Sequence, residues 1–251
     1  MLAKLKMRLD KKEELSWQMA SLFHGMLMEL LPEGYAAELH ESKRHPYTQH
    51  IEKYGEDWYW IVTALNEDTA NKMLKGVLMN LSEFVIKKHQ LSVRILEKTY
   101  QEMSNQELAR AFYQEQANRY ITIQFVTPTA FKQNGRYMNY PDIRSIYSNL
   151  MNKYDASNAE ESMKDEDTLE QLTEKTVLSR YELRSTVFCI EGIKIPAFIG
   201  KMTLRIDGTQ TMTNFANMLF NFGQYSGIGI KTALGMGAIR LLEGRSDENG
   251  R

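Results

Sequence analysis

The chain has 251 residues and is 43% hydrophobic, which is enough to build one large domain or two small ones with a core. Its net charge of −1 does not exclude an RNA partner, because residues 151–175 alone carry −5 and leave +4 for the rest. A single cysteine, Cys189, excludes disulfides within the chain, and its apolar neighbours predict a buried thiol. With no apolar run near 20 residues, we expect a cytoplasmic protein with no membrane partner.

Hydrophobic periodicity predicts the order β-α-β-β-α-β for the first half of the chain. Its aromatic segment Trp58-Tyr59-Trp60 is typical of a packed strand and less so of a base-stacking surface. The predicted elements are a strand at 2–10, a helix at 15–31, a hairpin of 46–53 with 58–65, a helix from Asp68 or Thr69 to Met79, and strands at 84–87 and 91–96.

The second half repeats this order without visible sequence identity to the first. The expected fold is α+β, with two tandem ferredoxin-like (RRM-like) βαββαβ domains at residues 1–110 and 118–245. The acidic stretch 155–175 is expected to be a solvated insertion or partly helical loop. The predicted elements are a strand at 120–131, a helix from Pro141 to about Lys153, strands at 181–191 and 197–206, a helix at 211–225 and a strand at 236–242.

A glycine-rich segment runs from Gly227 to Gly237 with the form G-x-G-x5-G-x-G, and Lys231 lies at its centre. It follows a predicted helix and precedes a predicted strand, whereas dinucleotide and P-loop motifs need the reverse order, so no nucleotide cofactor is expected. Glycines permit close approach of another backbone, either of the protein or of a nucleic acid. Gly227, Gly229, Gly235 and Gly237 are therefore candidate RNA contacts, with Lys231 placed for a phosphate.

This segment resembles the glycine-rich motif of the CRISPR-associated repeat-processing endoribonucleases, the "Cas six" family, and most resembles members from type III-A systems. Further segments resemble the family in the same order along the chain. The resemblance implies tandem ferredoxin-like domains, which agrees with the architecture predicted from periodicity. The matching segments are Phe23-His24-Gly25-Met26-Leu27-Met28, Leu39-His40, 127–132, Tyr140-Pro141-Asp142 and 195–200.

Four of the five histidines fall within residues 24–50. His40 and His45 are one residue too far apart for H-E-x-x-H, and no cysteine pair is nearby, so no metal site is expected. Histidine suits proton transfer near neutral pH, which metal-free RNA cleavage requires. The resemblance implies catalytic roles for His24 and His40, while His45 stands where many relatives carry a lysine and could be catalytic, a phosphate contact or a loop residue.

The resemblance implies metal-independent cleavage of precursor CRISPR RNA within its repeats. The 2′-OH attacks the adjacent phosphate, which leaves 2′,3′-cyclic phosphate and 5′-OH ends. We expect no cofactor and no DNA partner. We do expect a transient association with a type III effector complex. Residues expected to contact RNA are Lys43, Arg44, Lys132, Arg136 and Lys231 with the four glycines; His50 and His89 are expected at the surface. The alternative is a non-catalytic RNA-binding or structural subunit of a CRISPR effector complex.

Overall fold

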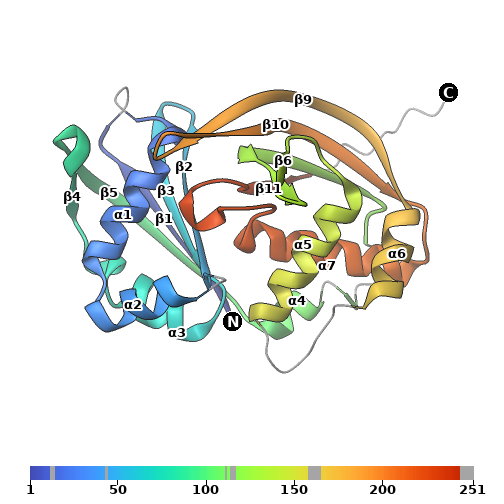
Figure 1. Cartoon of the computed structure of the whole chain (residues 1–251). Coiled ribbons are helices and arrows are strands. Elements are labelled where there is room, and N and C mark those ends of the chain that lie inside the picture. The colour runs from blue at the N-terminus through green and yellow to red at the C-terminus, as the bar shows by residue number, and fades with distance from the viewer. Residues whose placement is uncertain (12–14, 43–44, 111, 114–116, 158–164, 244–251) are drawn as a thin grey trace.

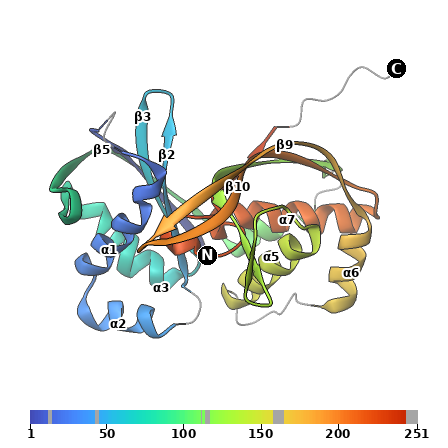
Figure 2. The ribbon, with the colours of Figure 1, turned by 45° about the horizontal axis from the view of Figure 1, so that its top comes forward.

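The computed structural model describes residues 1–11, 15–42, 45–110, 112–113, 117–157 and 165–243. Figure 1 shows two α/β halves side by side, each with a sheet and helices on one face of it. Figure 2, turned by 45°, shows β9 and β10 passing from the second half toward the first. None of the described helices is long and apolar enough to cross a membrane.

The sheet of the first half has the strand order β2-β3-β1-β5-β4. Without the extra edge strand β4, this is the antiparallel order of a ferredoxin-like domain. Apolar residues of β1 alternate with Lys4, Lys6 and Arg8, so one face of the strand packs on helices and the other carries charge. The strands are β1 (Leu2–Leu9), β2 (Tyr47–Tyr54), β3 (Asp57–Ala64), β4 (Glu83–Ile86) and β5 (Leu91–Met103), and the helices α1 (Ala20–Leu30), α2 (Glu33–Glu41) and α3 (Glu67–Thr69).

The second half has the equivalent order β11-β6-β10-β9, with α5 and α7 packed together against its apolar face. The predicted tandem ferredoxin-like fold is confirmed. The domain limits at residues 110 and 118 stay a prediction. The elements are α4 (Asn105–Arg110), β6 (Tyr120–Thr129), β7 (Phe131–Gln133), β8 (Arg136–Met138), α5 (Ile143–Ser157), α6 (Glu166–Glu174), β9 (Thr176–Ile190), β10 (Ile193–Ile206), α7 (Gln210–Ser226) and β11 (Ile239–Leu242).

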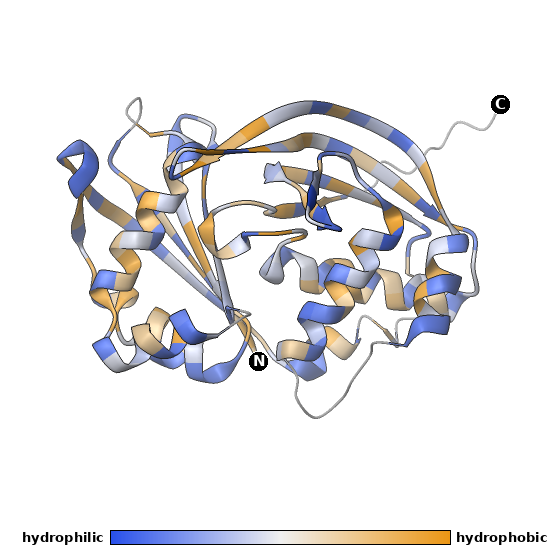
Figure 3. Ribbon diagram, in the orientation of Figure 1, coloured by the Kyte–Doolittle hydropathy of each residue, from blue (hydrophilic) through white to orange (hydrophobic). Residues whose placement is uncertain are grey.

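The β9–β10 hairpin is longer than predicted and reaches the first half of the molecule (Figures 1 and 2). Gln18 fixes it there, because its amide donates to the Val187 carbonyl at 2.8 Å and accepts the Cys189 N–H at 2.9 Å. Cys189 is exposed, so the prediction of a buried thiol is wrong. Alternation along β9 buries Phe188 and Ile190 and turns the residue between them outward, and Figure 3 shows the same alternation of hydropathy along both strands.

Two other local predictions need correction. Helix α3 is capped by Asn66, not by Asp68 or Thr69, because the Asn66 side chain accepts the Thr69 N–H, and α3 continues as a π-helical stretch over Ala70–Lys75. The acidic stretch 155–175 contains helix α6, so the partly helical alternative is confirmed, but α6 buries Leu169 and Leu172 in the core and is no merely solvated insertion. The packed-strand interpretation of Trp58 and Trp60 is confirmed, since they are 8% and 0% exposed.

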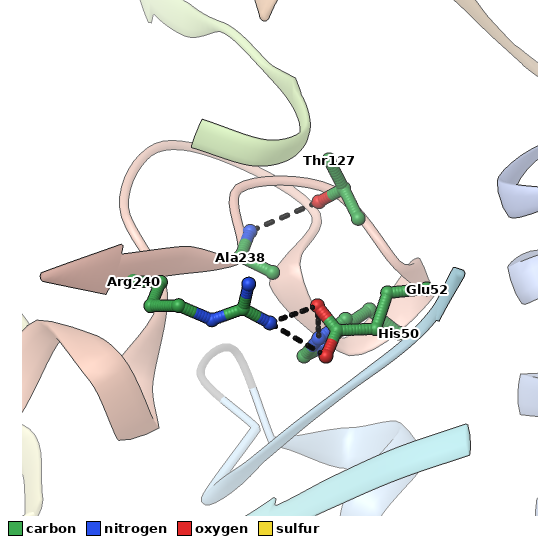
Figure 4. A network of polar contacts seen from close by, with 5 residues as sticks. All are labelled: His50, Glu52, Thr127, Ala238 and Arg240. Atoms are coloured by element: carbon green, nitrogen blue, oxygen red, sulfur yellow. Dashed lines mark hydrogen bonds and ion pairs between the residues drawn. The ribbon is translucent and has the colours of Figure 1, made fainter. Parts of the chain in front are cut away.

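A partly buried ion pair joins the two sheets. The Arg240 guanidinium on β11 donates to both carboxylate oxygens of Glu52 on β2, at 2.8 and 2.9 Å (Figure 4). His50 lies 3.8 Å from the same carboxylate and its side chain is only 14% exposed, so the expectation of a surface His50 is wrong. Burial alone would raise the pKa of Glu52, but His50 and then Arg240 outweigh it and lower the pKa.

The same network fixes the end of the glycine-rich segment. The N–H of Ala238, which directly follows Gly237, donates to the Thr127 hydroxyl at 3.0 Å (Figure 4). Since Arg240 lies two residues further on, β6 and β2 together hold the chain where it leaves the segment. The glycine-rich segment thus starts directly after α7 and ends just before β11, which is anchored to both halves.

Candidate active site and glycine-rich loop

The glycine-rich loop (Gly227–Gly237) leaves the second half and docks into the first. A 3₁₀ turn at Thr232–Leu234 places Ala233 in the core of the first half, 4% exposed. The side-chain NH₂ group of Gln49 on β2 donates to two carbonyls. One is that of Ala20 on α1, at 2.8 Å, and the other is that of Ala233 in the loop, at 3.0 Å. Trp60 donates to the Gln49 side-chain oxygen at 3.0 Å, so this buried amide is well satisfied.

The glycines of the loop are required by the protein's own packing. A Cβ at Gly237 would lie 2.0 Å from the Ile228 carbonyl oxygen, and one at Gly235 would lie 2.2 Å from the Ala20 Cβ. Gly229 would meet the Ala130 carbonyl oxygen at 2.4 Å, and Gly227 would meet that of Gly237 at 2.9 Å. All four have positive φ and are buried. Their predicted contact with RNA stays a prediction, but close approach within the protein already accounts for them.

Lys231 differs from these glycines, since it also has positive φ (55°) but carries an exposed side chain. A non-glycine residue in this left-handed conformation costs free energy that glycine would not. Such local strain is typical of functional sites. The loop therefore presents a lysine at a position where glycine would be the more stable residue.

Two side chains of helix α5 form hydrogen bonds with the loop. The Lys153 ammonium donates to the carbonyls of Ser226 and Gly227 at 2.9 and 3.0 Å, and to the Thr232 hydroxyl at 3.4 Å. One turn earlier, Asn149 accepts the Gly229 N–H at 2.8 Å and donates to the Gly229 carbonyl at 3.4 Å. Loop carbonyls and amides that packing would otherwise leave unpaired are thereby satisfied.

The buried ammonium of Lys153 predicts a pH dependence of stability. Burial lowers the pKa of Lys153 from its ordinary value of 10.5 to about 7. Between these values the unfolded chain holds more protons than the folded one, so the free energy of unfolding rises with pH. In urea titrations at pH 7 and 9, we expect the wild type to gain about 2 kcal/mol relative to Lys153→Met. A constant difference between the two proteins would contradict this environment for Lys153.

Three aromatic rings gather where α1, β2 and the loop meet. The rings of His24 and Tyr47 are nearly parallel, at 9° and 6.2 Å between centroids. The His45 ring lies 6.3 Å from that of His24 and 5.6 Å from that of Tyr47. His40, exposed in the last turn of α2, is near enough for its charge to lower the pKa of both other histidines. The structure therefore brings together the three predicted catalytic histidines.

The surroundings of His24 keep it neutral. Burial, then the charges of His45 and His40, lower its pKa to about 4, against a smaller opposing effect of the Ala233 backbone. Its Nδ1 lies 3.0 Å from the Tyr47 hydroxyl, and that hydroxyl lies 3.9 Å from the Met28 sulfur. With Nδ1 protonated, His24 donates to Tyr47 and Tyr47 donates to Met28; in the other tautomer Tyr47 donates to Nδ1. Tyr47 is fully buried, and burial raises its pKa, so it stays protonated.

Comparison with known proteins places this arrangement in a family. A curated CRISPR-associated endoribonuclease Cas6 from Streptococcus thermophilus is 36% identical over 225 residues, which is 90% of this chain and 92% of the relative. The chain belongs to the Cas6 family. The sequence model for CRISPR-associated endoribonuclease Cas6 matches residues 123–239. A Cas6 from Mycobacterium tuberculosis is 30% identical over 87% of this chain and 70% of its own length.

Solved Cas6 structures share the fold. A Cas6 product complex superimposes with a TM-score of 0.80 at 22% identity, covering 96% of this chain and 99% of that one. Thermus thermophilus Cas6 gives a TM-score of 0.72 at 22% identity, covering 96% and 98%. The family is one of endoribonucleases, so the predicted enzyme class is confirmed, while the likeness to type III-A members stays a prediction.

In this Cas6 chain two further predicted RNA contacts lie beside the loop. Lys132 and Arg136 are exposed on the β7–β8 hairpin. Tyr137 of this hairpin packs against the same apolar cluster as Ile230 and Leu234 of the loop. The predicted contacts Lys43 and Arg44 lie outside the described residues. His89 is exposed as expected.

Sequence reasoning missed the residues that hold the Cas6 site together. Tyr47 directly follows the His45-Pro46 pair, but a tyrosine in a strand pattern signals core packing equally well. Gln49 and Lys153 are polar residues on the apolar faces of a predicted strand and a predicted helix. That position is the sequence feature by which they could have been identified. Among the described residues, no three His, Cys, Asp or Glu side chains gather as metal ligands would.

Proposed function

We propose that the chain cleaves precursor CRISPR RNA within its repeats, without a metal ion, by attack of a 2′-OH on the adjacent phosphate. The observation that carries this proposal is the meeting of His24, His40 and His45 beside the glycine-rich loop. Two structural relatives support the substrate class, since one is a Cas6 product complex and the other a Cas6 substrate-mimic complex. The products carry 2′,3′-cyclic phosphate and 5′-OH ends.

His24 is suited to the role of general base. It is neutral near pH 7, so it can accept a proton but has none to give as an acid, and Tyr47 orients its ring. A base with a pKa of about 4 is weak, but the negative charge of a bound phosphate raises the pKa of a nearby histidine. His24 then removes the 2′-OH proton.

His40 is suited to the role of general acid, which protonates the departing 5′-oxygen. It is exposed in the last turn of α2, where it can exchange protons with solvent, and its charge acts on both His24 and His45. His45, packed against Tyr47, stabilises charge on the pentacoordinate phosphorus together with Lys43 and Arg44. Two histidines thereby divide the proton transfers.

An EDTA experiment tests the proposed function. Purified protein is incubated with a labelled repeat transcript in excess EDTA, with a shuffled transcript as the control RNA. We expect one cut in the repeat, a 2′,3′-cyclic phosphate end by mass spectrometry, and no cut in the shuffled RNA. Loss of activity in EDTA that returns on adding Mg²⁺ would contradict the metal-free chemistry.

Lys231→Gly separates stability from RNA binding. Removing the strained left-handed side chain is expected to stabilise the fold by about 1 kcal/mol, because glycine adopts this conformation freely. Losing the cation should weaken repeat-RNA binding about tenfold and reduce its salt dependence by about one phosphate contact. Thermal melts and filter binding between 50 and 200 mM salt measure both effects. An unchanged salt slope would remove Lys231 from the RNA interface.

The remaining assignments belong to this proposal. The enzyme works in the cytoplasm on newly transcribed repeats, and its cleaved RNA passes to a type III effector complex through a transient association. Lys132 and Arg136 extend the RNA contact along the β7–β8 hairpin. A non-catalytic subunit is the weaker alternative, because it gives no reason for three histidines to meet at the loop.

A further inference from the structure

A cavity of about 530 Å³ lies between helix α5 and the outer side of the glycine-rich loop. One wall is α5 from Asn149 to Ser157, the opposite wall is the loop from Ser226 to Leu234, and His45, Pro46 and Leu65 also line it. Its volume falls within the range of small-ligand sites. His45 lines this cavity and also belongs to the histidine cluster. An RNA chain that is cut at the histidines therefore passes next to the cavity.

The charge of the cavity favours an anion. Lys231 and the partly protonated Lys153 give its lining positive charge, and none of the described lining residues is Asp or Glu, although the chain has 32 acidic residues. Asn149, Asn152 and Ser157 add amide and hydroxyl groups, while Pro46 and Ile230 supply apolar surface. Cations, polar groups and apolar contacts together are what a nucleotide uses.

Hydrogen bonds join the two facing walls of the cavity. Lys153 makes three hydrogen bonds to the loop, and Asn149 makes two to Gly229, so the facing walls are tied together. The strained backbone of Lys231 holds its ammonium at this edge of the cavity. A rigid wall lowers the entropic cost of ordering a ligand.

We propose that this cavity binds one unpaired nucleotide of the RNA, next to the cut, with its base inside the cavity and its phosphate at Lys231. The proposal rests on the proposed function, since it makes the cavity the place where the RNA chain leaves the histidines. Base recognition in single-stranded RNA takes this form, with a base turned out of the stack. A cavity of this volume has room for one base.

Ala156→Trp tests the cavity without disturbing the histidines or the loop contacts. Ala156 is exposed on α5 and lines the cavity, so a tryptophan there fills it while the helix keeps its hydrogen bonds. Gln106→Trp, at an exposed position of α4 that does not line the cavity, is the matched control. Each protein is assayed with repeat RNAs that carry a single abasic nucleotide at successive positions around the cut.

In the wild type and in Gln106→Trp, we expect one abasic position beside the cut to weaken binding about tenfold. In Ala156→Trp, binding of unmodified RNA should fall by about the same factor, and the abasic change should cost nothing further. Uniform tolerance of abasic positions, or equal sensitivity in all three proteins, would overturn the cavity proposal. If the wild type does not cut unmodified repeat RNA in EDTA, the proposed function fails instead.

Discussion

Replacing His40 by alanine is expected to slow single-turnover cleavage of repeat RNA by about 10²–10⁴-fold, the usual contribution of a general acid or base. Repeat-RNA affinity should stay within about threefold, because His40 is exposed and its removal leaves no buried group unpaired. His24→Ala should slow cleavage to a similar extent, since it removes the group that Tyr47 orients. The measurement is product formation with enzyme in excess over labelled RNA.

His89→Ala is the matched control for both variants, because His89 is an exposed histidine on a different turn of the first half. It should cut at the wild-type rate. Free imidazole should partly restore cutting by His40→Ala, which a purely structural role of His40 would not allow. Wild-type rates in both His24→Ala and His40→Ala would refute the assignment of acid and base.

Gly237→Ala is expected to destabilise the fold by about 2–4 kcal/mol, combining left-handed backbone strain with overpacking. The added Cβ would lie 2.0 Å from the Ile228 carbonyl oxygen at a φ of +72°, and backbone cannot give way as a side chain does. Because the loop also holds Ala233 and Lys231 in place, repeat-RNA binding should fall with stability. Urea denaturation and filter binding on the same preparation measure the two effects.

Gly34→Ala is the comparison for this variant. A Cβ at Gly34 meets nothing within 4 Å, and Gly34 lies in α2, so alanine there should leave stability unchanged or raise it by up to about 1 kcal/mol. If Gly237→Ala is as stable as Gly34→Ala, the loop does not pack as described.

The element order could be predicted because it depends on local periodicity. The alternation in β1 and the apolar stripe of α7 are properties of short windows. The burial of Cys189 was wrongly predicted because a continuous apolar run does not reveal which face of a strand points outward. The length of the β9–β10 hairpin could not be predicted because it depends on a distant contact with Gln18. The packing of α6 on the core was missed because its charged residues obscure the two buried leucines.

The histidines could be found from the resemblance, whereas their environment could not. The partner of His24 is Tyr47, 23 positions away, and the support of the loop comes from Lys153, more than 70 positions earlier. Glu52 and Arg240 are 188 positions apart. Such pairs exist only after both sheets have formed and docked, so no local pattern contains them. The spacing of the glycines likewise indicated that another backbone lies close to the loop. It did not indicate whether that backbone belongs to the protein or to RNA.

The most direct test replaces a single 2′-OH by hydrogen, at the nucleotide immediately 5′ of the cut. The repeat RNA is otherwise unchanged, and binding and cleavage are measured on the same substrate in EDTA. The proposed mechanism predicts that binding is retained and cleavage is abolished, since the attacking nucleophile is gone. Cleavage of this substrate at the same bond would contradict attack by the 2′-OH.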